Sequence, residues 1–190
     1  ALNVPMGTIR KALLKVQPPP GRLEMVDKGQ KFTVIVDYAH EPSSLETIYK
    51  TIHNSKFIIH NSKLICLLGA QGGGRDKWKR PEMGKIAGKY CDKIILTNED
   101  PYDENPLQII NDIESGFLQM ANGKWQSEKN YWKIIDRREA IKKALSLAKK
   151  GDVVILTGKG GERWMCIENE NKIPWDERKI VEEIITEQRI

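Results

Sequence analysis

Four short apolar runs constrain the fold of this chain more than any other feature of its sequence. They lie at residues 32–36, 64–68, 94–96 and 153–156. Each is rich in leucine or β-branched residues, and none alternates with polar residues. Continuous runs of this kind are typical of strands buried on both faces, as in a parallel sheet.

Helical patterns fill the segments between these runs. Apolar stripes at helical spacing start at Leu45, Met83, Leu107 and Ala140, and Asn105 and Asp136 stand where helix caps belong. Alternation of strand and helix predicts an α/β fold with a doubly wound, mostly parallel sheet and helices on both faces. Residues 163–175 indicate an antiparallel hairpin at the sheet edge, and a last helix follows it.

The N-terminal segment is set off from the rest of the chain. Met6, Ile9 and Leu13 predict a helix, and Pro18-Pro19-Pro20-Gly21 must end it because prolines cannot continue a helix. We therefore expect residues 1–17 to close a preceding domain, residues 18–22 to form a linker, and residues 23–190 to form the main domain.

Polar or glycine-rich segments follow all four apolar runs, at residues 37–42, 69–77, 97–104 and 158–163. Ligands of open α/β sheets bind at the carboxyl ends of the strands. These four segments together predict a binding site at that edge. The second contains the P-loop spacing Gly69-x-x-x-x-Gly74, but Arg75-Asp76 stand where a P-loop has lysine and a hydroxyl residue. We therefore expect a turn that offers backbone N–H groups and Arg75 to an anion, and no nucleotide P-loop.

Individual residues of these segments allow two interpretations each. Arg75 can bind a substrate carboxylate or pair with an acid such as Glu82. His40 can contact a nucleotide or serve as an ordinary packing residue. Clustered acids after the third run can attract a ligand ammonium or remain solvated. That cluster consists of Glu99, Asp100, Asp103 and Glu104.

Composition excludes several other classes of protein. The net charge is only +5, from 31 Lys+Arg against 26 Asp+Glu. The five tryptophans do not interleave with a basic stripe, so we expect them to be packing residues. Both observations disfavour a nucleic-acid partner. No apolar run reaches the roughly 18 residues of a membrane span. Cys66 lies in an apolar run and is expected to be a small buried hydrophobic residue. The sequence contains no Cys/His cluster that would indicate a metal site. The composition suits a reducing cytosol.

Five motifs, in order, resemble the C-terminal domain of the Mur ligase family. They are PGRLE at 20–24, VIVDYAH at 34–40, GRDKWKRPEMG at 74–84, TNEDP at 97–101 and GKGGE at 158–162. The resemblance is strongest to members that add the third amino acid of the peptidoglycan stem peptide, and it implies a Rossmann-like domain in the cytoplasm of a bacterium. Such enzymes use ATP and Mg²⁺ to convert the carboxylate of UDP-N-acetylmuramoyl-dipeptide into an acyl phosphate, which the incoming amine attacks.

The resemblance also implies roles for particular residues. Those matching contacts to the amino-acid substrate are Arg75, Glu99, Asp100, Pro101, Tyr102, Gly158 and Glu162. Those matching residues near ATP in the closed enzyme are Arg22, Asp37 and His40. No residue of this chain is expected to be catalytic or to bind a metal.

Residues at two places depart from the family pattern: the segment 99–102, where members that use meso-diaminopimelate carry Asp-Asn-Pro-Arg, and Gly161. Tyr102 replaces an arginine that suits the distal carboxylate of diaminopimelate, and the two preceding acids, Glu99 and Asp100, better suit an ammonium. These departures predict L-lysine or another basic amino acid as the substrate. Gly161 replaces a histidine that is common in the family.

The family's P-loop lies in a central domain that this sequence lacks. We therefore expect a monomeric piece of a ligase, excised or encoded apart, that closes over ATP and is inactive alone. The alternative is a non-catalytic binding module that retains the fold. An independent kinase or synthetase is disfavoured because the P-loop match fails.

Overall fold

The computed structural model describes residues 3–16, 19–55, 61–120 and 123–188. Its helices are α1 (Met6–Leu13), α2 (Pro42–His53), α3 (Lys79–Tyr90), α4 (Pro106–Met120), α5 (Arg137–Ser146) and α6 (Glu177–Gln188). Its strands are β1 (Glu24–Val26), β2 (Thr33–Val36), β3 (Leu64–Leu68), β4 (Lys93–Thr97), β5 (Tyr131–Ile134), β6 (Val153–Leu156), β7 (Trp164–Cys166) and β8 (Lys172–Pro174).

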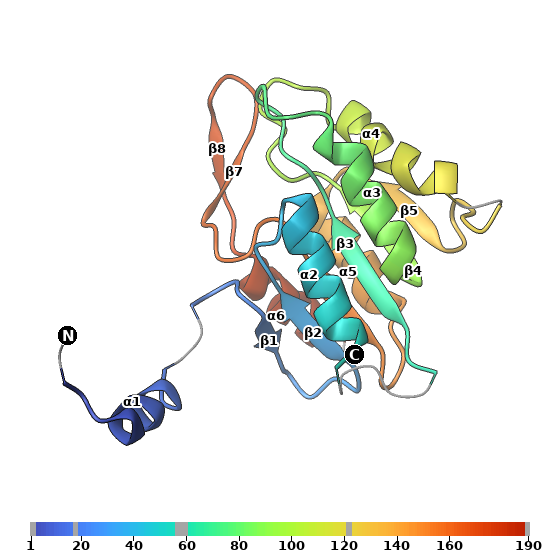
Figure 1. The fold of residues 1–190 in the computed structure, drawn as a ribbon. Helices are drawn as coiled ribbons and strands as arrows, with labels where there is room; N and C mark the ends of the chain where they lie inside the picture. Colours follow the sequence, from blue (N-terminus) through green and yellow to red (C-terminus); the bar gives the residue numbers. More distant parts are fainter. Residues whose placement is uncertain (1–2, 17–18, 56–60, 121–122, 189–190) are drawn as a thin grey trace.

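A six-stranded sheet forms the centre of the molecule, in the order β1-β2-β6-β3-β4-β5 (Figure 1). All neighbours pair in parallel except β1, which runs antiparallel to β2. The four predicted runs became β2, β3, β4 and β6, and every residue of β3 and β6 is buried. The doubly wound, mostly parallel α/β architecture is therefore confirmed.

Two cores lie on opposite faces of this sheet. Alternate strand residues such as Cys66 and Leu68 pack with α2, α3 and α4, whereas Ile65 and Leu67 pack with α5 and α6. This alternation explains the unbroken apolar runs, because both faces of each central strand need apolar side chains.

The sequence did not reveal the two outer strands. β5 carries the exposed Lys133, and β1 has only three residues with one of them buried. Edge strands are often short and carry charged side chains, which weakens their apolar pattern. Because β1 and β5 occupy the edges, the predicted hairpin cannot lie there. It is instead a separate two-stranded sheet, β7-β8, which stands beyond one end of the main sheet (Figure 1).

The predicted helices are all present, and their caps explain where two of them begin. Asn105 Oδ1 accepts from the Leu107 backbone N–H at 2.9 Å before α4, and Asp136 Oδ1 accepts from the Glu139 N–H at 2.9 Å before α5. Leu107 itself is exposed, so the predicted stripe of α4 starts one turn later, at Ile110. Within the part of the chain that the structure describes, no helix is long and apolar enough to span a membrane.

Helix α1 lies apart from the sheet and its covering helices (Figure 1). None of its residues is buried, and Met6 and Leu13 of the predicted stripe are 77% and 66% exposed. The predicted helix is therefore present, but its apolar stripe packs on no part of the described domain. The division of the chain into the end of a preceding domain (1–17), a linker (18–22) and a main domain (23–190) stays a prediction.

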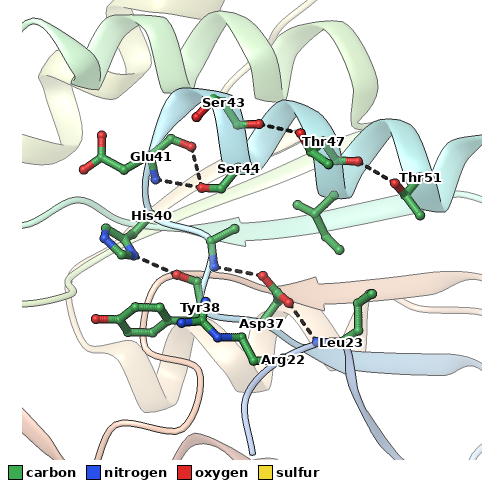
Figure 2. A pocket seen from close by; sticks show the side chains of 12 residues that line it. Arg22, Leu23, Asp37, Tyr38, His40, Glu41, Ser43, Ser44, Thr47 and Thr51 are labelled. Atoms are coloured by element: carbon green, nitrogen blue, oxygen red, sulfur yellow. Dashed lines mark hydrogen bonds between the residues drawn. The ribbon is translucent and has the colours of Figure 1, made fainter. Parts of the chain in front are cut away.

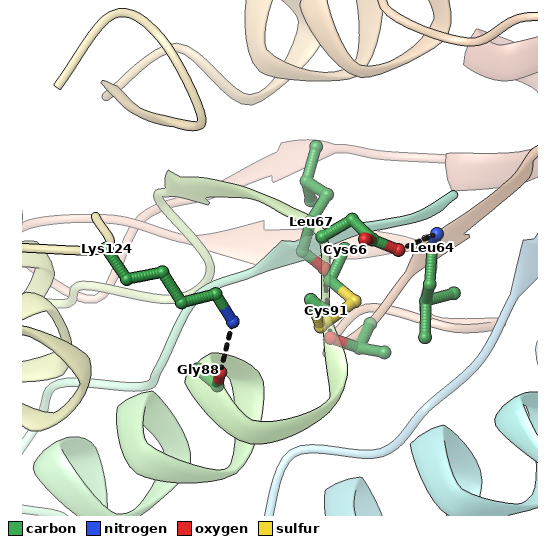
Figure 3. Close-up of a disulfide and its surroundings, with 8 residues drawn as sticks. Leu64, Cys66, Leu67, Gly88, Cys91 and Lys124 are labelled. Atoms are coloured by element: carbon green, nitrogen blue, oxygen red, sulfur yellow. Dashed lines mark hydrogen bonds between the residues drawn. A yellow bond between two sulfur atoms is a disulfide. The ribbon is translucent and has the colours of Figure 1, made fainter. Parts of the chain in front are cut away.

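Cys66 of β3 is fully buried, as expected, but it is not a free thiol. It forms a disulfide with Cys91, the residue that follows α3, with an S–S distance of 2.07 Å (Figure 3). These cysteines lie 25 residues apart in sequence, and only the packing of α3 against β3 brings them together. Cys166 is the free cysteine of the described chain.

Candidate functional site

The carboxyl ends of the sheet strands surround a cavity of about 440 Å³, here called the edge cavity. Segments from all four predicted loops and from the β7–β8 hairpin contribute to its walls. Its lining residues are Tyr38, His40, Glu41, Gln71, Arg75, Lys79, Asp100, Tyr102, Glu162, Arg163, Trp164, Cys166 and Lys172. Four predicted substrate-binding residues, Arg75, Asp100, Tyr102 and Glu162, therefore meet around one hollow.

Lys159 holds the acidic wall of the edge cavity together. Its fully buried Nζ donates to Asp100 Oδ1 at 2.8 Å and to Glu162 Oε2 at 2.5 Å. Burial lowers the pKa of Lys159, but the hydrogen bonds to the two carboxylates outweigh burial and the net pKa is raised. Lys159 is therefore a fixed cation that orients both carboxylates. Asp100 also accepts from the Cys166 backbone N–H at 2.8 Å, which ties the hairpin to the site.

Tyr38 continues this network toward Arg22. Its hydroxyl donates to Glu162 Oε1 at 2.9 Å, and the Arg22 guanidinium lies 4.3 Å from the centre of its ring. Burial, followed by the contact with Glu162, raises the pKa of Tyr38, so the hydroxyl keeps its proton and acts as a donor. Glu162 is thus held by two donors, Lys159 and Tyr38, while 31% of its side chain remains exposed.

Tyr102 and Arg75 form the opposite wall. Tyr102 has a φ of 51°, and its ring packs on Gly73, where a Cβ would lie 2.8 Å from ring atom Cδ2. A hydrogen bond with Cys166, together with burial, raises the pKa of Tyr102, while a hydrogen bond with Arg75 opposes the shift. Arg75 is exposed and makes this contact, whereas Glu82 binds Lys85 at 2.6 Å. The alternative in which Arg75 pairs with Glu82 is therefore not observed.

Glu99 does not line the edge cavity. Its side chain is fully buried, and neither carboxylate oxygen has a hydrogen-bond partner among the described residues. Burial raises its pKa to about 7. The predicted pair of free acids is therefore wrong in its geometry, because Glu99 is enclosed and Asp100 already binds Lys159.

Gly158 and Pro101 also lie outside the lining of the edge cavity. Gly158 has a φ of +105°, and a Cβ there would lie 2.3 Å from Glu99 Oε2. Both residues are buried. Gly158 therefore leaves room for the Glu99 carboxylate, and Pro101 adjoins another hollow, next to Tyr102 and Asn105.

A second cavity of about 660 Å³, here called the helix cavity, lies against α2 (Figure 2). All three residues predicted to lie near ATP, namely Arg22, Asp37 and His40, line it. Asp37 accepts from the Leu23 and Ala39 backbone N–H groups, both at 2.8 Å, so it orders the loop. His40 Nδ1 donates to the Tyr38 carbonyl at 2.8 Å. Tyr38, His40 and Glu41 line both cavities, which therefore adjoin.

The glycine-rich loop after β3 is not an open anion cradle. The Gly72 N–H donates to the Asp100 carbonyl at 2.8 Å, and the Gly74 N–H points to Glu104 Oε1 at 3.4 Å. Two of the N–H groups expected to face an anion are thus already used, although Arg75 remains available. Among the described residues, no group of three His, Cys, Asp or Glu side chains could hold a metal ion.

Sequence reasoning assigned no role to Lys159 or Tyr38, although both lie inside the GKGGE and VIVDYAH motifs. Their positions could have indicated a role, since each lies in a motif whose neighbouring residues were predicted to contact a ligand. The prediction that all tryptophans are packing residues is wrong for Trp78 and Trp164, which are 63% and 52% exposed. Trp164 lines the edge cavity from the hairpin, which had been placed elsewhere.

A doubly wound sheet with two adjoining cavities at its carboxyl edge defines a Rossmann-like domain with a candidate ligand site. Residues 21–160 match the model of the family described as "Mur ligase, glutamate ligase domain". The chain belongs to the Mur ligase family.

Relatives of this chain carry a common name, UDP-N-acetylmuramoyl-L-alanyl-D-glutamate--2,6-diaminopimelate ligase. One from Syntrophomonas wolfei is 41% identical over 94% of this chain and 34% of its own length. Another from Caldanaerobacter subterraneus is 44% identical over 98% of this chain and 36% of its own length. The chain thus spans about a third of the length of these relatives.

Solved structures support the fold. A structure of a ligase with the same name has a TM-score of 0.75 and 33% identity, over 93% of this chain and 33% of its own. The Mycobacterium tuberculosis folylpolyglutamate synthase complexed with ADP has a TM-score of 0.59 and 17% identity, over 82% and 33%. The second likeness concerns the fold alone.

Proposed function

We propose that this chain is the amino-acid-binding C-terminal domain of an ATP-dependent ligase of peptidoglycan synthesis. The whole ligase joins the dipeptide carboxylate of a UDP-N-acetylmuramoyl-dipeptide to the amine of an incoming amino acid. One observation carries the proposal: the edge cavity adjoins the helix cavity through Tyr38, His40 and Glu41. A ligase needs its amine and its activated carboxylate side by side, and adjoining sites supply that proximity.

The edge cavity has the charges that a free amino acid requires. Arg75 is exposed and offers a guanidinium to the α-carboxylate, a charge-assisted contact. Glu162 is oriented by Lys159 and Tyr38 and keeps an exposed part that can accept from the α-ammonium. These residues bind and orient the substrate, which places its amine near the helix cavity.

The helix cavity fits part of a nucleotide. Arg22 supplies hydrogen-bond donors for anionic oxygens, His40 lines the same cavity, and the hydroxyl groups of α2 supply polar contacts (Figure 2). Those hydroxyl residues are Ser43, Ser44, Thr47 and Thr51. When bound, ATP supplies the phosphoryl group that activates the peptide carboxylate as an acyl phosphate. Closure of this domain over the nucleotide would exclude water from that intermediate.

The incoming amino acid is a diamino acid in this proposal. The names of the relatives indicate 2,6-diaminopimelate. L-lysine, the amino acid expected from the sequence, is the second candidate, because Tyr102 stands where an arginine would meet a distal carboxylate. The other argument for L-lysine was that Glu99 and Asp100 would bind its distal ammonium. That argument loses support, because Asp100 is paired with Lys159 and Glu99 is buried.

The test is an ATP-dependent phosphate-release assay on the full-length protein that carries this chain. UDP-N-acetylmuramoyl-dipeptide and an amino acid should both be required for release. Residues 1–190 alone should release no phosphate, because they contain no P-loop of the GxxxxGK[ST] form. A full-length protein that binds an amino acid but never turns over ATP would support the non-catalytic binding module instead.

A further inference from the structure

The edge cavity is continued past Tyr102 by a third hollow of about 760 Å³, here called the distal cavity. Tyr102, Cys166 and Lys172 line both hollows, so the two adjoin along this line of residues. The remaining walls of the distal cavity are Gly73, Gly74, Asp103, Glu104 and Glu170. An extended ligand held by Arg75 and Glu162 in the edge cavity could reach past Tyr102 into the distal cavity.

Two of the four charged residues that line the distal cavity, Glu104 and Asp103, already have partners. Glu104 accepts from Arg80 at 3.0 Å and lies 3.3 Å from Lys77 Nζ, and Asp103 accepts from the Asn169 backbone N–H at 2.8 Å. Arg80 is fully buried, so its contact with Glu104 belongs to the structure of the domain.

Two charges of the distal cavity are not committed. Lys172 of β8 and Glu170 of the β7–β8 turn are exposed, and neither side chain has a hydrogen-bond or ion-pair partner in the described part of the chain. Lys172 is therefore the cation that a ligand carboxylate meets first after passing Tyr102. Glu170 lies in the same wall and offers a carboxylate to a ligand ammonium.

These charges discriminate between the two candidate substrates. The distal end of L-lysine is an ammonium alone, which matches Glu170 but leaves Lys172 without a partner and approaches it with a like charge. A diamino dicarboxylic acid ends in both a carboxylate and an ammonium, and this zwitterion complements Lys172 and Glu170 together. A specific site gains selectivity both from the matched charge and from repulsion of the unmatched one.

We propose that Lys172 binds the distal carboxylate of a diamino dicarboxylic acid and is a specificity-determining residue of the site. The cation comes from the hairpin, while the segment 99–102 contributes Tyr102, which stands where the family pattern has an arginine. This inference rests on the proposed ligase function. It makes the hairpin part of the substrate site, anchored there by the bond from the Cys166 N–H to Asp100.

The experiment measures steady-state kinetics of the full-length protein with meso-2,6-diaminopimelate and with L-lysine. The natural protein should prefer meso-2,6-diaminopimelate. In K172Q the KM for meso-2,6-diaminopimelate should rise about tenfold while kcat changes little, because an exposed charge-assisted contact of modest strength is lost. The preference of K172Q for meso-2,6-diaminopimelate over L-lysine should be smaller than that of the natural protein by a similar factor. K172R keeps the positive charge and should restore this preference.

K150Q is the matched control. Lys150 is also exposed but precedes β6, at the opposite end of the strands, so its removal should change neither KM. Three results would overturn the inference: a natural preference for L-lysine, an unchanged KM for meso-2,6-diaminopimelate in K172Q, or equal losses with both amino acids. If neither amino acid supports phosphate release by the natural protein, the ligase proposal itself fails.

Discussion

Two buried charged residues at the carboxyl edge, Lys159 and Glu99, are in opposite circumstances. Lys159 is enclosed but has two carboxylate partners. Glu99 is enclosed with no hydrogen-bond partner among the described residues. A buried charge without partners costs folding free energy, and the group responds by holding its proton more tightly. The fold therefore favours the protonated form of Glu99.

Replacing Glu99 with glutamine should make stability less dependent on pH. The pKa of Glu99 is about 7 in the folded chain, above the ordinary 4.5. A raised carboxyl pKa contributes stability that is present below pH 4.5 and lost as the pH rises through 7. The free energy of unfolding of the natural chain, minus that of E99Q, should fall by up to about 3 kcal/mol over this window.

Urea denaturation at pH 4.5, 6, 7 and 8 measures this difference. The difference should level off above pH 7, where Glu99 is ionised in both states. As a control, E139Q replaces an exposed glutamate of α5 and should show no such slope. A constant difference between E99Q and the natural chain at all pH values would contradict the burial of an unpaired carboxylate.

Helices α3 and α4 pack closely because glycines face each other's backbone. A Cβ on Gly84 would lie 1.9 Å from the Ile113 carbonyl oxygen, and a Cβ on Gly116 would lie 1.9 Å from the Pro81 carbonyl oxygen. This approach lets Arg80 of α3 donate to Asp112 of α4 at 3.0 Å. The packing thereby fixes the start of α3, directly after the loop that carries Arg75.

Gly84→Ala should therefore destabilise the domain although alanine is the better helix former. Overpacking typically costs about 1–3 kcal/mol, and the obstacle here is a backbone atom that cannot rotate away. Gly7→Ala is the matched control, since nothing lies within 4 Å of a Cβ at that position of α1. It should leave the unfolding of the domain unchanged. Thermal unfolding of both variants measures the effect. If Gly84→Ala and Gly7→Ala had the same melting temperature, the close approach of α3 to α4 would be contradicted.

The molecule as a whole brings two candidate ligand sites together from segments far apart in sequence. The helix cavity combines Arg22 and Leu23 with α2, and the edge cavity combines loops after β2, β3, β4 and β6 with the hairpin. Tyr38 lies between them and bonds to Glu162, which is 124 residues away. The two sites share a wall but differ in their cations, so their ligands should be separable by mutation.

Arg22→Ala and Arg75→Ala should separate the two substrates in the full-length protein. Arg22→Ala should raise the KM for ATP about tenfold with little effect on the amino acid, and Arg75→Ala should do the reverse. Steady-state kinetics with each substrate varied in turn give the four values. If Arg75→Ala raised the KM for ATP instead, the edge cavity would not be the amino-acid site.

The sequence predicted most of the sheet because burial on both faces leaves a local signature. Residues 64–68 and 153–156 form strands with the predicted bounds. The outer strands β1 and β5 were missed because an edge strand carries a weaker apolar pattern. With those edges unrecognised, nothing in the sequence could exclude the hairpin from them, and its place over the site went unseen.

The sequence by itself determined the elements, their order and the motifs that gather at the carboxyl edge, since periodicity and motif spacing are properties of neighbouring residues. Only the tertiary structure decided which of the gathered side chains are open to a ligand. It enclosed Glu99, paired Asp100 with Lys159, joined Cys66 to Cys91 and left Lys172 without a side-chain partner in the part of the chain that the structure describes. The burial and pairing of a side chain depend on segments that are distant in the sequence. A pattern of neighbouring residues does not show which distant segments will pack against it.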